Sequence, residues 1–338
     1  MEKICSIVYE TKAGAYTEFE FEYIANVILK NVDKQFFFDN AQLSIIKDNP
    51  VIVYSYDGRF LPNAFLNYFK KNKNYILFHC SNEGLNHNAG YYSKANAVFR
   101  QGGWDPNITR KNTFSIPFGF QSGFLNRAPE KLIFSNKTLY WSFFGAIKSN
   151  RVAMKKALDK ISPNFHFTSS GWNSADQKGP KEISAYYKKT IFLPNPFGNI
   201  HFDCFRTMEG LEYGCIPVCI KFHGFDAYKY LYGDHPFIIE KNWELATKKM
   251  QELIKNPDAL QKKQLEAWTW YQKFKDDLGN DVKKILHGDT ENLVSKQFYY
   301  QRKAKYNILL RLTFFYIFTF SVYFNRFILR KYIPAANH

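Results

Sequence analysis

The sequence predicts an α/β protein built from two successive doubly wound domains. Short apolar runs alternate with amphipathic segments in both halves of the chain, a pattern typical of parallel sheets flanked by helices. A segment rich in Pro and Gly, 114–130, separates the two halves. The chain has 338 residues, of which 46% are hydrophobic, and this composition can fill two sizeable cores.

In the first half, strands are expected where short apolar runs lie between polar segments. These runs are 4–9, 51–56, 75–80 and 97–100. The helical segments between them are 19–30, 62–71 and 91–96. We therefore expect a first Rossmann-like domain over residues 1–125, with segment 114–130 as the loop that leads out of it.

The second half repeats the alternation. Strands are expected at 139–144, 165–169, 191–194 and 216–221, and helices at 150–161, 182–190 and 205–213. Gly214 is expected to end the last of these helices, because glycine favours the position after a helix. Residues 243–286 are expected to form a charged, terminal helical cap, so that the second Rossmann-like domain covers 126–290.

Basic charge is concentrated in a C-terminal tail, 291–338. The net charge is +16, and eight basic residues follow Glu291 with no acidic one among them. The body is only mildly basic, which argues against a nucleic-acid binder. Residues 312–324 are uncharged and aromatic, but a spanning helix needs about 20 apolar residues. The tail is expected to be helical and to associate with an anionic membrane surface; a helix folded onto the body is the alternative.

The cysteines and the N-terminus favour a cytoplasmic protein. The five cysteines show no CxxC pair and no zinc spacing, and they fit buried, reduced thiols. Residues 1–10 lead directly into a strand-like run and lack the apolar core of a signal peptide. We expect the body of the protein to lie in the cytoplasm.

The segment 191–220 carries the most informative pattern. A predicted strand is followed by an irregular loop, a helix and a second apolar strand, and ligands of open α/β sheets bind outside the carboxyl ends of the strands. Arg206 falls in the first turn of the helix, where a guanidinium can bind phosphate with two hydrogen bonds. Glu209 lies on the same face, three residues on. A plain surface ion pair between the two is the alternative interpretation.

These residues resemble the signature of the exostosin-like glycosyltransferases. The resemblance rests on F-R-x-x-E-x-L-x-x-G-C-I-P-V at 205–218, on a strand, Gly and Arg pattern at 140–151, and on a Pro-Phe with a later Trp at 236–243. It covers roughly 139–272 and implies a GT-B fold, in which two Rossmann-like domains face a cleft. The chain departs from the family at Asp203 and Cys204, where Ser or Thr is common.

The resemblance implies a donor site in the second domain. Arg206 would hold the diphosphate of a nucleotide-sugar, Glu209 the ribose, and Arg151 would provide a second phosphate contact. The remaining residues expected at the donor are Gly198, Asn199 and Phe205.

An inverting transfer also needs a base that takes the proton of the acceptor hydroxyl, and in this fold it would come from the first domain. Three candidates follow predicted strands: Glu83, the first choice, then Asp57 and His79. Arg100 and Trp104 are expected to contact the acceptor sugar, although Trp104 could instead pack between the domains.

No pair of carboxylates follows a strand in the DxD pattern, so no metal site and no cofactor are expected. The sequence thus predicts an inverting, metal-independent hexosyl- or pentosyltransferase that acts on a surface glycan or lipid-linked oligosaccharide. It would work as a peripheral protein on the cytoplasmic face of a bacterial inner membrane, bound through residues 296–331. Alternatives are a non-catalytic nucleotide- or sugar-binding module of a polysaccharide assembly complex, and an epimerase or phosphorylase of the same architecture.

Overall fold

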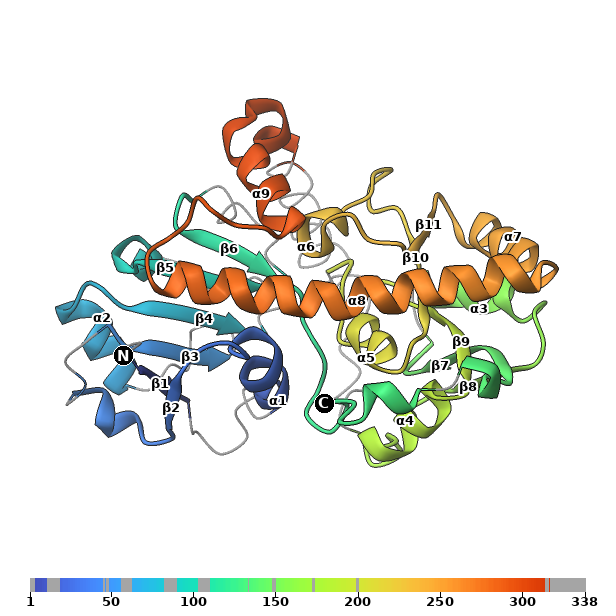
Figure 1. Ribbon diagram of the computed structural model, residues 1–338, viewed down its shortest axis with the longest axis horizontal. Coiled ribbons are helices and arrows are strands. Elements are labelled where there is room, and N and C mark those ends of the chain that lie inside the picture. The colour runs from blue at the N-terminus through green and yellow to red at the C-terminus, as the bar shows by residue number, and fades with distance from the viewer. Residues whose placement is uncertain are drawn as a thin grey trace, which may run out of the picture.

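The computed structural model contains two α/β domains, each built on one parallel sheet, and one long helix that runs along both (Figure 1). The residues that it describes are 4–10, 19–44, 46, 49–55, 63–81, 90–102, 110–132, 134–147, 150–171, 174–198, 201–313 and 316.

The first sheet has the strand order β2-β1-β3-β4-β5-β6. Its strands are β1 (Cys5–Tyr9), β2 (Lys34–Phe37), β3 (Val51–Ser55), β4 (Ile76–Cys80), β5 (Ala97–Gln101) and β6 (Thr113–Ile116). The helical segments between them are α1 (Phe21–Tyr23), the π-helix η2 (Ile24–Ile28), the 3₁₀ helices η3 (Asn40–Ser44) and η4 (Gly90–Lys94), and α2 (Asn63–Lys71).

Both faces of this first sheet are covered. Along β3, Val51 and Val53 belong to one hydrophobic cluster, and Ile52 and Tyr54 belong to another. Successive side chains of a strand point to opposite faces, so the two clusters lie on opposite sides of the sheet. This double burial explains why β3 is an almost continuous apolar run in the sequence.

The second sheet has the order β11-β10-β9-β7-β8. Its strands are β7 (Leu139–Phe144), β8 (Asn164–Phe167), β9 (Thr190–Pro194), β10 (Ile216–Ile220) and β11 (Ile238–Glu240). Its helices are α3 (Asn150–Leu158), α4 (Pro180–Tyr187), α5 (Arg206–Glu212), α6 (Lys229–Tyr232) and α7 (Trp243–Ile254), and the short 3₁₀ helices η6 (Pro129–Lys131) and η7 (Phe134–Asn136) precede them. The predicted alternation is confirmed here, and β7 has the predicted bounds.

The expectation of a loop throughout 114–130 is wrong at its beginning. Thr113–Ile116 forms β6, the sixth strand of the first sheet, and its four residues are buried. Pro117 and Gly119 mark the end of that strand, but the run before them pairs with β5. Two further short strands, β2 and β11, were also missed, because runs of three or four residues carry little periodic signal.

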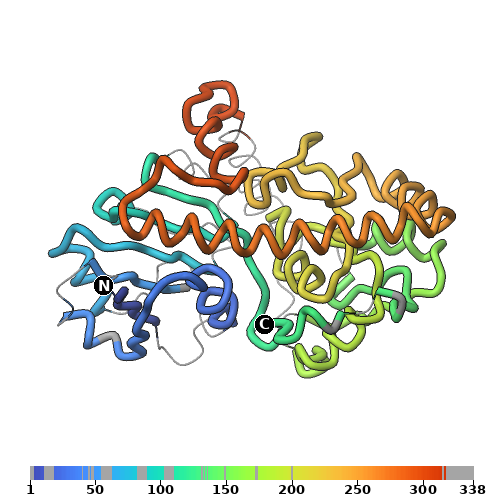
Figure 2. The backbone as a smooth tube through the Cα atoms, in the orientation of Figure 1, coloured from blue at the N-terminus to red at the C-terminus, as the bar shows by residue number. Residues whose placement is uncertain are grey.

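The predicted cap of the second domain is in fact a connection between the domains. Helix α8 (Pro257–Leu286) is 30 residues long and runs past both sheets (Figure 2). Its first part packs on α7, β10 and α5, and its last part packs on η2 of the first domain. A Cβ at Gly279 would lie 3.0 Å from the carbonyl oxygen of Val27, so this close approach requires glycine.

The beginning of the basic tail is folded onto the body. Helix α9 (Lys296–Tyr306) packs on α6 and β6. Gln301 joins the two domains: it accepts a hydrogen bond from the Ser115 backbone N–H at 2.9 Å and donates to the Tyr230 carbonyl at 2.6 Å. Within the described part of the chain, no helix has both the length and the apolar character needed to cross a membrane.

Candidate functional site

The order of the second sheet creates a switch point between β7 and β9. From β7 the chain passes to β8 on one side and then returns to β9 on the other. The loops that follow β7 and β9 therefore separate, and they leave a crevice at the carboxyl ends of these two strands, where open α/β sheets bind their ligands. Gly145, with a φ of 140°, ends β7, and its N–H donates to the Phe167 carbonyl at 3.1 Å.

Two arginines meet at this switch point, each from the first turn of the helix that follows one of these loops. A Cβ built on Gly145 would lie 3.5 Å from Nη1 of Arg151 and 3.6 Å from Nη2 of Arg206. Both guanidinium groups also face the ring of Phe143, at 5.9 and 4.8 Å from its centroid. Arg151 donates to the Ala146 carbonyl at 3.0 Å, which orients its guanidinium. The fold thus gathers two positive charges that are 55 positions apart in the sequence.

Helix α5 begins beside a buried carboxylate. Asp203 accepts hydrogen bonds from the Thr207 hydroxyl at 2.9 Å, from the Tyr232 hydroxyl at 2.9 Å and from the Phe118 backbone N–H at 3.2 Å. Burial raises the pKa of Asp203 to about 6, although these hydrogen bonds oppose the rise. Because a carboxylate already lies at the helix start, Arg206 and Arg151 are the groups best suited to an anionic ligand.

Glu209 lies deeper than the sequence suggested. Its side chain is only 6% exposed, and its carboxylate accepts the backbone N–H of Gln121 from the interdomain segment. Burial raises the pKa of Glu209 to about 7, and the neighbouring Arg206 charge lowers it only in part. Near neutral pH such a carboxyl group can both donate and accept a hydrogen bond.

The loop between β9 and α5 contains the other expected donor residues. Phe205 is buried and meets the ring of Phe118 edge-on at 5.9 Å. Gly198 donates its N–H to the His201 carbonyl at 2.8 Å, and this bond closes the loop. Asn199 lies outside the described residues.

Three of the first-domain candidates, Asp57, Glu83 and Trp104, also lie outside the described residues. The other two, His79 and Arg100, are brought together by the β4–β5 register. Nη1 of Arg100 lies 3.1 Å from Nδ1 of His79, and the same nitrogen of His79 is hydrogen-bonded to the Tyr92 hydroxyl. Both side chains are buried, with 1% of His79 and 0% of Arg100 exposed.

Two carboxylates that the sequence analysis did not single out lie at the carboxyl edge of the first sheet. Glu10 directly follows β1, and Glu20 accepts a hydrogen bond from the Ser81 hydroxyl after β4. Burial, and then the charges of Glu20 and Glu10, raises the pKa of the Cys80 thiol, so both acids lie near the end of β4. The position of Glu10 directly after an apolar run was a signal that could have identified it.

His201 is a third residue that sequence reasoning missed. It is 3% exposed, and neither ring nitrogen has a hydrogen-bond partner among the described residues. Its ring packs edge-on against Phe118, and a Cβ on Gly102 of the first domain would lie 2.8 Å from its Nε2. Burial lowers the pKa of His201 to about 3, and the Arg100 charge acts in the same direction. A neutral imidazole without a hydrogen-bond partner among the described residues therefore lies where the two domains meet, in the loop that leads to Arg206, and no local pattern predicts that placement.

Across the described residues, no group of three or more His, Cys, Asp or Glu side chains is arranged to hold a metal ion. The fold and the site together define a two-domain protein with parallel sheets and a cationic switch point in the second domain.

No protein-family model matches the chain, and no curated protein sequence matches it either. Among solved structures, a crystal structure of an α1,3-fucosyltransferase is similar, with 14% identity, 85% of this chain and 91% of that chain covered, and a TM-score of 0.47. A crystal structure of an α1,3-fucosyltransferase with GDP-fucose gives 12% identity, coverages of 87% and 96%, and a TM-score of 0.43. Similarity at this level carries no functional argument, so the function is argued from the residues of this chain.

Proposed function

We propose that this chain is a glycosyltransferase of the GT-B class that uses a nucleotide-sugar donor. The observation that carries the proposal is the convergence of Arg151 and Arg206 beside Gly145 at the β7–β9 switch point. Two guanidinium groups that face the same small space repel each other, and an anion bound between them would offset that repulsion. A diphosphate supplies several acceptor oxygens to such a pair, and each guanidinium can bind it with two hydrogen bonds.

The donor residues then take separate roles. Arg206 and Arg151 hold the diphosphate and stabilise its negative charge as the sugar leaves. Glu209, with a pKa of about 7, exchanges hydrogen bonds with the ribose hydroxyls. The loop that contains Gly198, Asn199 and Phe205 encloses the donor. Membership of the exostosin-like family is part of this proposal.

The acceptor side belongs to the first domain. A base there takes the proton of the acceptor hydroxyl while that oxygen attacks the anomeric carbon and the nucleoside diphosphate departs, which inverts the configuration. Glu83 is the proposed base, with Asp57 and His79 as alternatives, and Arg100 and Trp104 are proposed to contact the acceptor. Glu83→Gln should retain donor binding and lose turnover. Normal turnover in this variant would transfer the role to another residue.

Transfer without a metal is also part of the proposal, because the two arginines provide positive charge at the leaving group. Activity should therefore persist in EDTA. Loss of activity in EDTA and its recovery with Mn²⁺ would contradict this part of the mechanism.

The acceptor is proposed to be a surface glycan or lipid-linked oligosaccharide at the cytoplasmic face of the inner membrane. Apolar side chains at the end of α9 and just after it support this, since Tyr306, Ile308 and Leu309 are 75%, 69% and 72% exposed. Arg311 follows them, as expected for a segment at an anionic surface. A chain that ends after Tyr306 keeps α9 and should no longer sediment with anionic liposomes. Equal sedimentation of this shortened chain and the full chain would contradict the membrane role.

The donor site is tested by a thermal-shift screen with UDP, GDP, CMP and dTDP. One nucleotide should raise the melting temperature of the wild type, since a ligand at about 100 times its Kd stabilises by about 2.7 kcal/mol. Arg206→Ala should abolish that shift, whereas Arg302→Ala, an exposed arginine on α9, should keep it. If no nucleotide shifts the wild type, or if Arg206→Ala responds equally, the donor assignment is wrong. Donor binding without any transfer would favour the non-catalytic alternative.

A further inference from the structure

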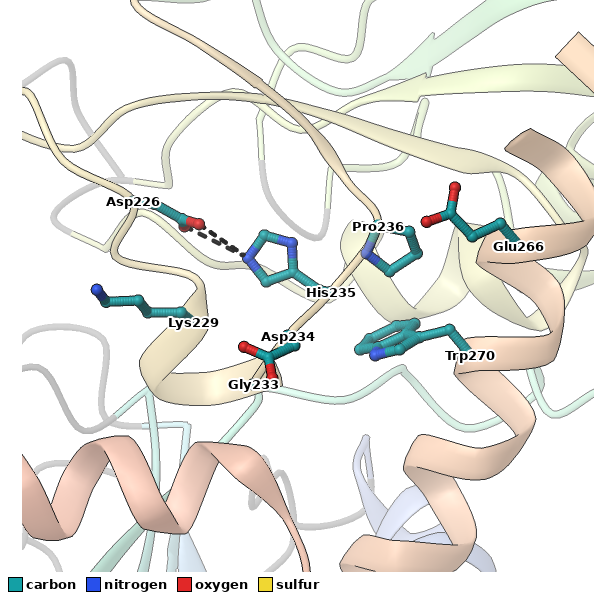
Figure 3. Close-up of a pocket in the computed structure, with 8 residues that line it drawn as sticks. All are labelled: Asp226, Lys229, Gly233, Asp234, His235, Pro236, Glu266 and Trp270. Carbon is teal, nitrogen blue, oxygen red and sulfur yellow. Dashed lines mark hydrogen bonds and ion pairs between the residues drawn. The ribbon is translucent and has the colours of Figure 1, made fainter. Parts of the chain in front are cut away.

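A cavity whose lining contains no switch-point residue lies between α6, the loop that follows it and the middle of α8 (Figure 3). Its volume is about 430 Å³, which is within the usual range of small-molecule sites. The residues that line it are Asp226, Lys229, Gly233, Asp234, His235, Pro236, Glu266 and Trp270. None of them has a role in the proposed transfer.

One wall of this pocket is held in place by a hydrogen bond between two side chains. Nε2 of His235 lies 3.3 Å from the Asp226 carboxylate, and its ring stacks on Phe237 at 4.3 Å. Burial raises the pKa of Asp226, but the hydrogen bond and charge of His235, together with the Tyr228 and Lys229 backbone N–H groups, lower it overall. Asp226 is therefore an ionised acceptor with a fixed position.

The opposite wall is aromatic and comes from α8. Trp270 stacks on Phe274 at 5.0 Å and meets the edge of Phe237 at 5.3 Å, so its indole is held on two sides. Glu266 lies one helical turn earlier, and Figure 3 shows it and Trp270 projecting from α8 toward Pro236. A rigid indole beside carboxylates suits a sugar ring, whose C–H groups pack on the aromatic face while its hydroxyls donate to the acids.

The charges of the residues that line the pocket indicate whether it suits an anionic, a cationic or a neutral ligand. Three carboxylates, those of Asp226, Asp234 and Glu266, face a single ammonium group, that of Lys229, so an anionic ligand would be repelled. A cationic ligand would be repelled by Lys229, and part of the negative charge is already compensated within the protein, although a carboxylate with one partner can still accept from a hydroxyl. Asp234 accepts a hydrogen bond from the Tyr300 hydroxyl, and Glu266 pairs with Lys263 at 2.9 Å. A neutral polyol avoids both conflicts, because its hydroxyls donate to the carboxylates and accept from the ammonium group.

We propose that this pocket binds one neutral sugar residue of a glycan. In the context of glycosyl transfer, that sugar would be a remote unit of the acceptor, held outside the reaction centre so that a growing chain stays bound. This assignment to the acceptor rests on the proposed function, whereas sugar binding in the pocket does not.

Binding is tested on the full chain by saturation-transfer NMR with glucose, galactose, rhamnose, N-acetylglucosamine and N-acetylgalactosamine, and with spermidine as the cationic probe. At least one sugar should bind, and Trp270→Ala should weaken it about tenfold or more. Trp270→Phe, which keeps the aromatic packing, and Glu266→Gln should each weaken it less. Trp268→Phe, a matched change elsewhere on α8, should leave it unchanged.

The two proposals can fail separately. Sugar binding that persists when no nucleotide shifts the protein would leave this pocket intact and remove the transferase assignment. Absence of binding by all five sugars, binding unaffected by Trp270→Ala, or binding by spermidine alone would overturn the sugar pocket. The sugar pocket would also be overturned if a nucleotide displaces the sugar and Arg206→Ala weakens sugar binding, because the sugar would then lie at the switch point.

Discussion

Glu209 should make this protein less stable as the pH rises toward neutrality, the reverse of what an ordinary carboxylate does. The side chain is 6% exposed and lies between α5 and the interdomain segment, where the Gln121 backbone N–H is its donor. Burial raises its pKa from 4.5 to about 7, and the charge of Arg206 offsets only part of that rise.

The sign and size follow from proton linkage. Between pH 4.5 and about 7 the folded protein holds a proton on Glu209 that the unfolded chain has lost, so stability falls as the pH rises. The contribution is fully present below pH 4.5 and is lost as the pH passes through about 7. The difference between the two pKa values corresponds to about 3 kcal/mol, as an order of magnitude. Asp203, with a pKa raised from 3.8 to about 6, adds a decrease of the same sign at lower pH.

The assay is urea unfolding of the wild type and Glu209→Gln at several pH values from about 4.5 to about 8. The variant should lose much less stability over that interval, and its advantage over the wild type should grow as the pH rises. Arg206→Ala should extend the decrease to higher pH, because the loss of that positive charge raises the pKa of Glu209 further and so widens the interval over which stability falls. Glu244→Gln, an exposed glutamate on α7, is the control. If the difference between Glu209→Gln and the wild type does not change with pH, the burial argument is refuted.

Three further perturbations test the packing around the site by urea unfolding. Gly210→Ala places a Cβ 2.2 Å from Cδ2 of the buried Leu193, so it should lower the free energy of unfolding by about 1–3 kcal/mol. The loss should be smaller in a Leu193→Ala background, and an equal loss there would contradict the packing argument. His201→Leu removes two buried nitrogens that have no hydrogen-bond partner among the described residues, so it should stabilise by about 1 kcal/mol. A loss of stability would show that the imidazole has a structural role. Lys275 lies 3.0 Å from the fully buried Glu212, so Lys275→Met should lower the free energy of unfolding by about 3–5 kcal/mol. Adding Glu212→Gln to this variant should recover part of the loss. Additive effects of the two substitutions would indicate that the two side chains are not coupled.

The strand and helix pattern was readable from local sequence wherever a segment is buried by its own domain. The runs that form β7, β9 and β10 are largely apolar because both faces of a central parallel strand are covered. Gly214, with a φ of 66°, follows α5 as expected for a residue that leaves a helix. By contrast, β6 was masked by the Pro and Gly that follow it, and only its pairing with β5 defines it as a strand.

The sequence by itself determined two doubly wound units, and it indicated that Arg151, Arg206 and Glu209 could serve an anionic ligand. Only the tertiary structure decided that the two arginines share one space, because the strand order places β7 beside β9 although β8 lies between them in the chain. Tertiary packing likewise raised the pKa of Glu209 and brought His201 against the first domain. Burial and the distances between charges depend on which distant segments of the chain lie side by side, and local sequence patterns do not indicate which segments these are.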